Sequence, residues 1–195
     1  MRSALLCLVI VVVPYLFTQA QNVPVFTITP VASSITFYVK SSVKLTGTFD
    51  EWDASLTFTS PDVTTGVVDI KIQAATVDTG SKMKDDKLKS KDCFDVKRNP
   101  LITFHSTKIV RTGPDTFDVP GTFTLRGVSK PETLRLTVSG QGTGSGTIKG
   151  MMAVDRRDYG LKGNIPFVKI AHRVEVTVEL KGNRVSGPPL VFQKQ

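Results

Sequence analysis

Apolar and polar residues alternate along most of this chain, from Phe26 almost to its end. In residues 34–39, for example, Ile35, Phe37 and Val39 alternate with polar or amphipathic neighbours. A period of two residues is typical of a strand with one apolar face, and helical periodicity is scarce. About eight to ten such strands fit, separated by turn residues such as Ser60-Pro61-Asp62. The sequence therefore predicts an all-β protein of one domain.

The alternation leaves open whether the strands form two packed sheets or one closed barrel. In a barrel of about eight strands, the phenylalanines on the apolar strand faces would converge on the interior and line a cavity. The alternative is that these rings pack against one another and fill the core. The phenylalanines concerned are Phe37, Phe49, Phe58, Phe104 and Phe123.

The interval from Thr79 to Arg98 differs from the rest, because it is highly charged and poor in β-branched residues. We expect a long loop with one or two short helical turns, which either caps one end of the β-structure or lies solvated on the surface. Cys93, in this interval, is either a reactive thiol that could link a dimer or a buried, inert thiol beside Phe94.

The N-terminus resembles a secretory signal. Arg2 precedes an apolar run from Ala4 to Phe17, and small residues lead up to Ala20. The run is about 14 residues long, short of the roughly 20 that a membrane anchor needs. We expect a signal peptide at 1–20 and a secreted or periplasmic protein. Cleavage would remove Arg2 and lower the net charge from +8 to +7.

No catalytic or metal motif stands out. The two histidines, His105 and His172, lack metal-ligand spacing, no G-x-S-x-G elbow is present, and Gly140 to Gly146 lacks the Lys-Ser/Thr ending of a phosphate loop. We predict no catalytic residue, no metal and no cofactor. Basic clusters at 82–91 and 126–135 could attract an anionic membrane surface, whereas export and intervening acids argue against nucleic acid.

Residues 155–160 place four charges directly after an apolar stretch. One interpretation is an Asp–Arg pair that serves structure at a strand end. The other makes Arg156 or Arg157 the partner of a polar ligand head group, with Asp158 orienting the guanidinium.

Several segments, taken in order, resemble the YceI-like family of exported polyisoprenoid-binding proteins. The most specific is the central block, a charged stretch that ends in "FDV" at 94–96 and the strand around Pro100-Leu101-Ile102-Thr103-Phe104. The "LRGVSKP" hairpin and the "RRDYG" turn further on are also similar to the family. The similarity spans about 26–182, and the segments lie at 26–40, 47–49, 84–96, 99–107, 121–131 and 155–160. The chain departs from the family at Ala32-Ser33-Ser34 and Thr79-Gly80-Ser81, where a histidine and an arginine are frequent.

This resemblance implies a lipocalin-like antiparallel barrel over 21–182, with a C-terminal tail at 183–195 that frays or lies along the surface. It implies a long apolar cavity that holds a polyisoprenoid or similar long-chain lipid without catalysing a reaction on it, for transport or storage. Two alternative functions remain. One is a β-sandwich interaction module with a filled core, and the other is a lipid esterase that uses Cys93 or a histidine. The oligomeric state also stays open, and a dimer is possible. The expected lining residues are Phe37, Leu45, Phe49, Phe58, Phe104, Phe123 and Met152, with Phe94 closing one end.

Overall fold

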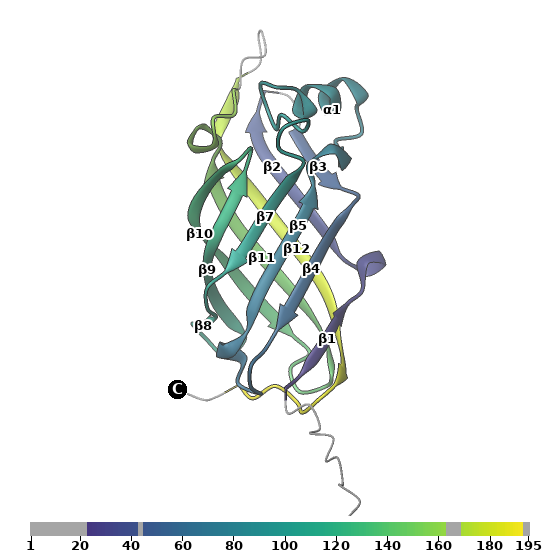
Figure 1. Ribbon diagram of the computed structural model, residues 1–195, viewed down its shortest axis with the longest axis vertical. Helices are drawn as coiled ribbons and strands as arrows, with labels where there is room; N and C mark the ends of the chain where they lie inside the picture. The colour runs from purple at the N-terminus through teal and green to yellow at the C-terminus, as the bar shows by residue number, and fades with distance from the viewer. Residues whose placement is uncertain (1–22, 43–44, 163–168, 193–195) are drawn as a thin grey trace, which may run out of the picture.

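A computed structural model describes residues 23–42, 45–162 and 169–192 of the chain. These residues form one antiparallel sheet that curls into an elongated barrel with tilted strands, and one α-helix lies across one end of it (Figure 1). We call the end that carries this helix the upper end and the opposite one the lower end.

In the described residues, twelve strands occupy eight positions around the barrel wall, because four positions hold two strands in succession. β1 (Val25–Ile28) and β2 (Ser34–Ser41) both pair with β12 (Ile170–Ser186), one after the other. In the same way, β7 (Leu101–Ser106) and β8 (Val110–Arg111) both pair with β9 (Thr116–Leu125).

The other two wall positions that hold two strands in succession close the barrel. β3 (Leu45–Phe49) pairs with β2 on one side and with β6 (Val77–Asp78) on the other, and β4 (Trp52–Thr57) pairs with β5 (Val67–Gln73). From β5 the pairing continues to β7, β9, β10 (Val128–Ser139), β11 (Ser145–Asp155), β12 and back to β2. Lower down, β1 lies beside β4, with no strand pairing between these two segments in the described ranges.

The alternation in the sequence matches the two faces of this wall. On β2, Ile35, Phe37 and Val39 are buried, whereas Tyr38 is exposed. On β11, Met152 is 8 % exposed and its neighbour Met151 is 58 % exposed. The structure thus confirms the all-β fold and shows a barrel rather than a sandwich. The expected number of about eight matches the wall positions, while short interruptions raise the number of strands to twelve.

The charged interval forms the upper end, where α1 (Lys82–Lys89) is followed by a run of turns. The Asp85 carboxylate accepts hydrogen bonds from the backbone N–H and the hydroxyl of Thr79, at 2.9 and 2.7 Å, and so ties the helix to the preceding strand. The Phe94 N–H donates to the Leu88 carbonyl at 2.9 Å, and Phe94 is buried. The expected short helix is therefore present, and it caps the barrel instead of lying free on the surface.

The lower end is formed by the β10–β11 turn and by the end of the chain. Gly140, Gly142 and Gly144 in this turn have positive φ angles, which glycine adopts without strain. β12 continues to Ser186, past the predicted domain end at 182. The segment after it returns to the barrel: the Val191 N–H donates to the Pro61 carbonyl at 2.8 Å, and the Phe192 and Phe117 rings lie 6.2 Å apart.

The predicted signal peptide at 1–20 and its cleavage point after Ala20 lie outside the described residues. Among the residues that are described, no helix has the length and apolar character needed to cross a bilayer.

Candidate functional site

Three cavities follow one another along the inside of the barrel. The upper cavity has a volume of about 130 Å³, the middle one about 20 Å³ and the lower one about 100 Å³. The middle cavity shares part of its lining with each neighbour, so that some side chains border two of the three spaces. Ile35, Ile72, Phe123 and Val176 line both the upper and the middle cavity, and Ile70, Leu134 and Val178 line both the middle and the lower one.

All eight residues expected to line a cavity face one of these spaces. Phe37, Leu45, Phe49, Phe94 and Phe123 line the upper cavity, Phe104, Phe123 and Met152 the middle one, and Phe58 the lower one. Some of these rings also pack together, because the centroids of Phe37 and Phe49 lie 5.7 Å apart and those of Phe49 and Phe94 6.1 Å apart. The interior thus combines aromatic packing with open space. That these residues contact a ligand stays a prediction.

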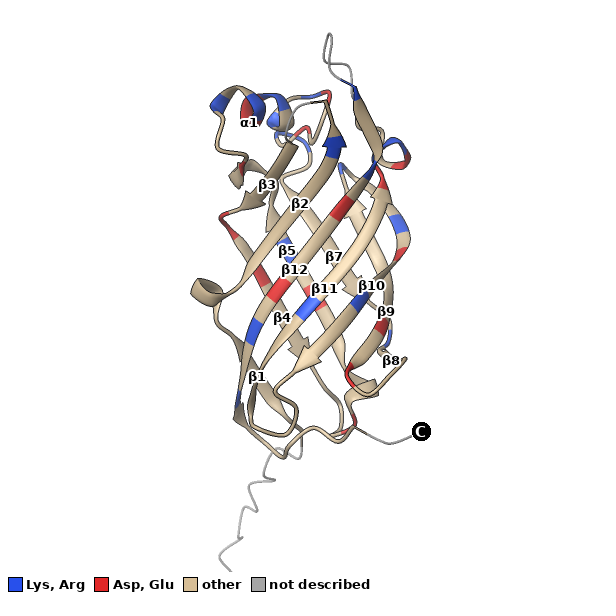
Figure 2. Ribbon diagram, turned by 180° about the vertical axis from the view of Figure 1, so that it is seen from behind, with Lys and Arg blue, Asp and Glu red and all other residues tan. Residues whose placement is uncertain are grey.

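Four basic residues, and no aspartate or glutamate of the described chain, line the upper cavity. Lys84 and Lys87 come from α1, Arg156 from the short 3-10 helix at Arg156–Tyr159, and Lys162 from the segment after it. Charged residues gather at this end of the barrel, whereas the lower-end loops carry few (Figure 2). Sequence reasoning found the basic cluster at 82–91 but not its place at a cavity mouth, which only the folded chain reveals.

The Arg156 guanidinium is held in place by backbone oxygens. Its Nε donates to the Ala171 carbonyl at 3.0 Å and its Nη1 to the Leu161 carbonyl at 2.8 Å, while Nη2 lies 3.4 Å from His172 Nδ1. No ion pair with a carboxylate neutralises Arg156 within the described ranges. Arg156 is therefore a fixed positive charge beside an apolar space.

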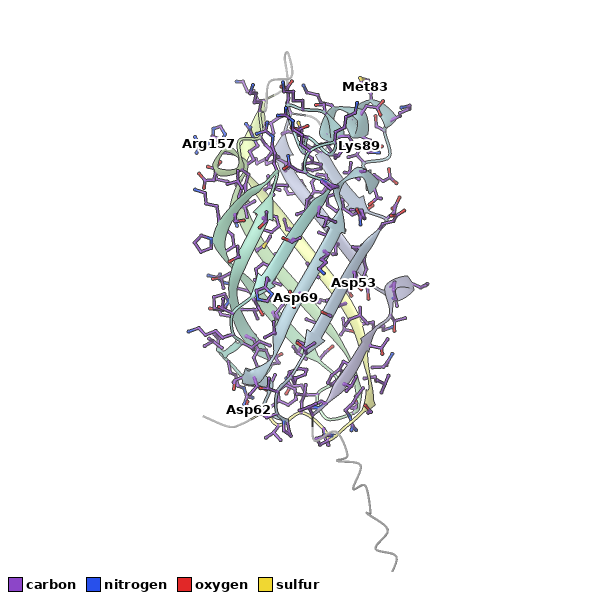
Figure 3. The ribbon with its side chains drawn as sticks, viewed as in Figure 1. Asp53, Asp62, Asp69, Met83, Lys89 and Arg157 are labelled. Atoms are coloured by element: carbon purple, nitrogen blue, oxygen red, sulfur yellow. The ribbon has the colours of Figure 1, made fainter. Side chains whose placement is uncertain are left out.

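The other two predicted head-group residues are placed differently. The Arg157 side chain turns back to Asp155, lies outside the cavity linings and projects from the wall near the upper end (Figure 3). The side chain and backbone N–H of Arg157 hold the pKa of Asp155 well below its ordinary value. Asp158 is exposed, and the expected orienting role toward Arg156 belongs instead to the two carbonyl oxygens. The Asp155–Arg157 pair thus holds the turn at the end of β11, in line with the interpretation that an Asp–Arg pair here serves structure.

Cys93 also lines the upper cavity and is buried, 8 % exposed. Its Sγ lies 3.9 Å from the Lys162 carbonyl oxygen. Burial raises the pKa of the thiol, against the opposing positive charges of Lys87, Arg156 and Arg126. The thiolate fraction at neutral pH is therefore below that of an exposed cysteine.

We expect iodoacetamide to alkylate Cys93 at pH 8 at least about tenfold more slowly in the folded protein than in urea, because burial limits both access and ionisation. The rate is measured by mass spectrometry on the peptide that contains Cys93. Equal rates in the two states would show that the upper cavity is open to solvent and reagent at this residue.

The lower cavity contains residues that were not expected to line a cavity. The β10–β11 hairpin supplies glycines, among them Gly140, Gly142 and Gly144, and the segment after β12 supplies Pro189, Leu190 and Phe192. The signals in the sequence are the glycine-rich run at 140–146 and the apolar residues 190–192 directly after two prolines. Among the described residues of this lining, Arg184 is the sole charged one, and it donates to the Gly187 carbonyl.

The titratable groups of the described chain form no arrangement typical of catalysis. His105 Nδ1 lies 2.6 Å from the Asp69 carboxylate on the outer face of the wall, and no hydrogen bond of the described residues joins Cys93 to either histidine. Within the same ranges, no three His, Cys, Asp or Glu side chains are grouped as metal ligands.

Comparison with known proteins identifies relatives of this barrel. The YceI-like domain matches residues 26–182. A UPF0312 protein of Pseudomonas aeruginosa is 31% identical over 145 residues, which are 72% of this chain and 74% of the relative. The crystal structure of BcnA from Burkholderia cenocepacia superimposes with a TM-score of 0.72 at 26% identity, over 80% of this chain and 99% of BcnA. A polyisoprenoid-binding domain from Saccharophagus degradans, implicated in plant cell wall breakdown, shares the fold, with a TM-score of 0.65 at 17% identity over 83% of this chain and 99% of that domain.

Proposed function

Because this chain belongs to the YceI-like domain family, we propose that it is a lipid-binding protein that holds a polyisoprenoid or similar long-chain apolar ligand inside its barrel. The row of three apolar cavities carries this proposal. The relative from Saccharophagus degradans, named for polyisoprenoid binding, supports it through the shared fold.

The dimensions of the cavities favour an extended ligand. A cavity of about 150 Å³ holds a molecule the size of benzene, so neither end cavity alone takes a long chain. A chain that runs through all three must displace the side chains between them, and Met152 at the middle cavity is flexible enough to move. Each methylene removed from water contributes about 0.8 kcal/mol, which offsets the cost of this rearrangement over a long chain.

We further propose that the protein is exported, binds without catalysing a reaction, and serves transport or storage of its ligand. The signal-like segment at 1–20 supports export to a secreted or periplasmic location. The excess of basic residues supports transient contact with an anionic membrane surface.

Native mass spectrometry of protein purified from its source tests the proposal. We expect about one apolar chain per protein, released on solvent extraction, because the row has room for one extended ligand. The same spectrum gives the mass of the chain, which begins at Gln21 after the expected cleavage. A ligand-free mass that persists after incubation with isoprenoid lipids would refute lipid binding and favour an interaction module.

A further inference from the structure

Residues 187–192, which we call the C-terminal strap, run across the lower end of the barrel (Figure 1). They follow β12 and lie beyond the region 26–182 that the YceI-like domain matches. Pro189, Leu190 and Phe192 of the strap line the lower cavity. The strap is thus a part of the cavity lining that this chain adds to the matched domain.

Two backbone hydrogen bonds clip the strap to the segment before β5. The Val191 N–H donates to the Pro61 carbonyl at 2.8 Å, and the Val63 N–H donates to the Val191 carbonyl at 3.2 Å. Leu190 and Phe192, on either side of this clip, line the cavity, whereas Val191 is 50 % exposed. The strap therefore combines one backbone clip with two apolar side chains that cover the lower cavity.

The strap begins with a glycine that is followed by two prolines. Gly187 has a φ angle of 78°, which glycine adopts without strain. The rings of Pro188 and Pro189 restrict the backbone that follows. A rotation at Gly187 therefore moves residues 188–192 as one unit once the clip at Val191 is broken.

An apolar chain meets less charge at the lower end of the row than at the upper end. Among the described residues of the lower lining, only Arg184 is charged, and it donates to the Gly187 carbonyl. Four basic residues line the upper cavity, and Arg126 ties the segments there together through the Gly160 and Lys91 carbonyls, each at 3.1 Å. Displacing water from charged groups costs free energy. The lower end therefore offers a hydrocarbon chain the smaller desolvation cost.

We propose that the C-terminal strap is a lid over a second mouth of the cavity row, and that an apolar chain enters and leaves the barrel at this lower end when the strap swings out. This inference rests on the proposed function, because it assigns the route taken by the ligand that the barrel holds. With the lid closed, Leu190 and Phe192 cover the lower cavity.

A disulfide that locks the strap tests the lid. Asp62 and Val191 pair in a parallel bridge. Neighbouring strands lie about 4.8 Å apart, which suits the Cα separation of about 4.4–6.8 Å in a disulfide. The Asp62→Cys, Val191→Cys protein is loaded with deuterated geranylgeraniol and then oxidised, and Cys93 stays buried at the opposite end of the barrel.

Transfer of the deuterated chain to phosphatidylcholine vesicles that contain the unlabelled alcohol is followed by native mass spectrometry. We expect the oxidised form to transfer at least about tenfold more slowly than the same protein after reduction with dithiothreitol, because a locked lid limits release. The reduced form carries the same substitutions, so that loss of the Asp62 carboxylate, which accepts from the Thr64 N–H, affects both forms equally.

Strap variants test the same route without a cross-link. Leu190→Ser combined with Phe192→Ser removes the apolar cover, and we expect transfer to be at least about threefold faster. Val191→Ser is the matched control, because Val191 belongs to the same strap but lines none of the three cavities, and its rate is expected to stay unchanged. Thermal unfolding establishes that each variant is folded, and Leu190→Ser alone replaces the pair if loss of the Phe192 contact with Phe117 prevents folding.

The outcomes separate the lid from the proposed function. Equal transfer by the oxidised and the reduced forms overturns the lid, assigns exchange to the upper end and leaves lipid binding intact. Strap variants that transfer no faster than Val191→Ser also overturn it, whether or not the disulfide forms. Failure of the native protein to take up geranylgeraniol or a longer polyprenol contradicts the proposed function itself.

Discussion

Met152→Glu is expected to reduce the lipid retained by the purified protein to less than about a tenth, whereas Met151→Glu leaves it unchanged. Both residues lie on β11, but Met152 lines the middle cavity and Met151 faces solvent. Glutamate has nearly the length of methionine, so the change is mainly one of polarity. A carboxyl group without a hydrogen-bonding partner costs about 2–7 kcal/mol in an apolar space, more than a few buried methylenes return.

Lipid extraction and chain analysis on both variants measure this effect. Met152→Trp supplies a second approach without a buried acid, because its larger side chain fills the middle cavity and excludes a long chain by volume. A folded Met152→Glu or Met152→Trp protein that retains the full amount of lipid would show that the ligand does not pass the middle cavity.

Tyr159→Ala is expected to lower the free energy of unfolding by about 3–5 kcal/mol, the usual cost of deleting a large buried aromatic side chain. Tyr159 is 0 % exposed and is the last residue of the 3-10 helix that carries Arg156. Its ring packs edge-on against Phe123 with centroids 5.5 Å apart, and its hydroxyl donates to Glu132 Oε1 at 3.0 Å. Urea denaturation measures the change, and Tyr38→Ala, at an exposed position on β2, is expected to stay within about 0.5 kcal/mol.

The Tyr159 hydroxyl gives this prediction a second readout. Burial and the neighbouring Glu132 raise the pKa of Tyr159 in the folded protein. Above about pH 10 the unfolded chain therefore loses this proton first, and stability falls as the pH rises. Tyr159→Phe is expected to cost only about 1 kcal/mol at neutral pH and to weaken the alkaline loss. An unchanged alkaline loss in Tyr159→Phe would assign it to other groups.

The strands of the barrel wall could be predicted from the sequence, because the alternation of apolar and polar residues is visible within each short segment. Alternation in residues 34–39 identifies the inward side chains directly, and the seven lining residues expected from strands do face the interior cavities. The interruptions were not predictable in the same way. Whether β3 and β4 form one strand or two depends on which neighbours their backbones pair with, and those neighbours are remote in the sequence.

The ends of the barrel were harder to predict, since tertiary contacts decide the role of each residue. Lys82 and Lys87 are alike in the sequence, but only Lys87 faces the cavity, because α1 presents one side to the barrel mouth. Arg156 and Arg157 are adjacent arginines, but Arg157 pairs with the Asp155 carboxylate and Arg156 does not. Residues 189–192 line the lower cavity because the chain returns to Pro61, and the alternation of apolar and polar residues does not predict this contact.

The pairing of β1 and β2 with β12 sets a condition on the order of folding. Val25 pairs with Ser186 and Ser34 with Glu179, so the first wall position is completed by the last strand of the chain. Closure must therefore wait until nearly the whole chain has been synthesised, and such contacts between distant residues form slowly. A nascent chain that lacks β12 has an open edge on β11 and another on β2, and it remains accessible to chaperones until its final segment is released.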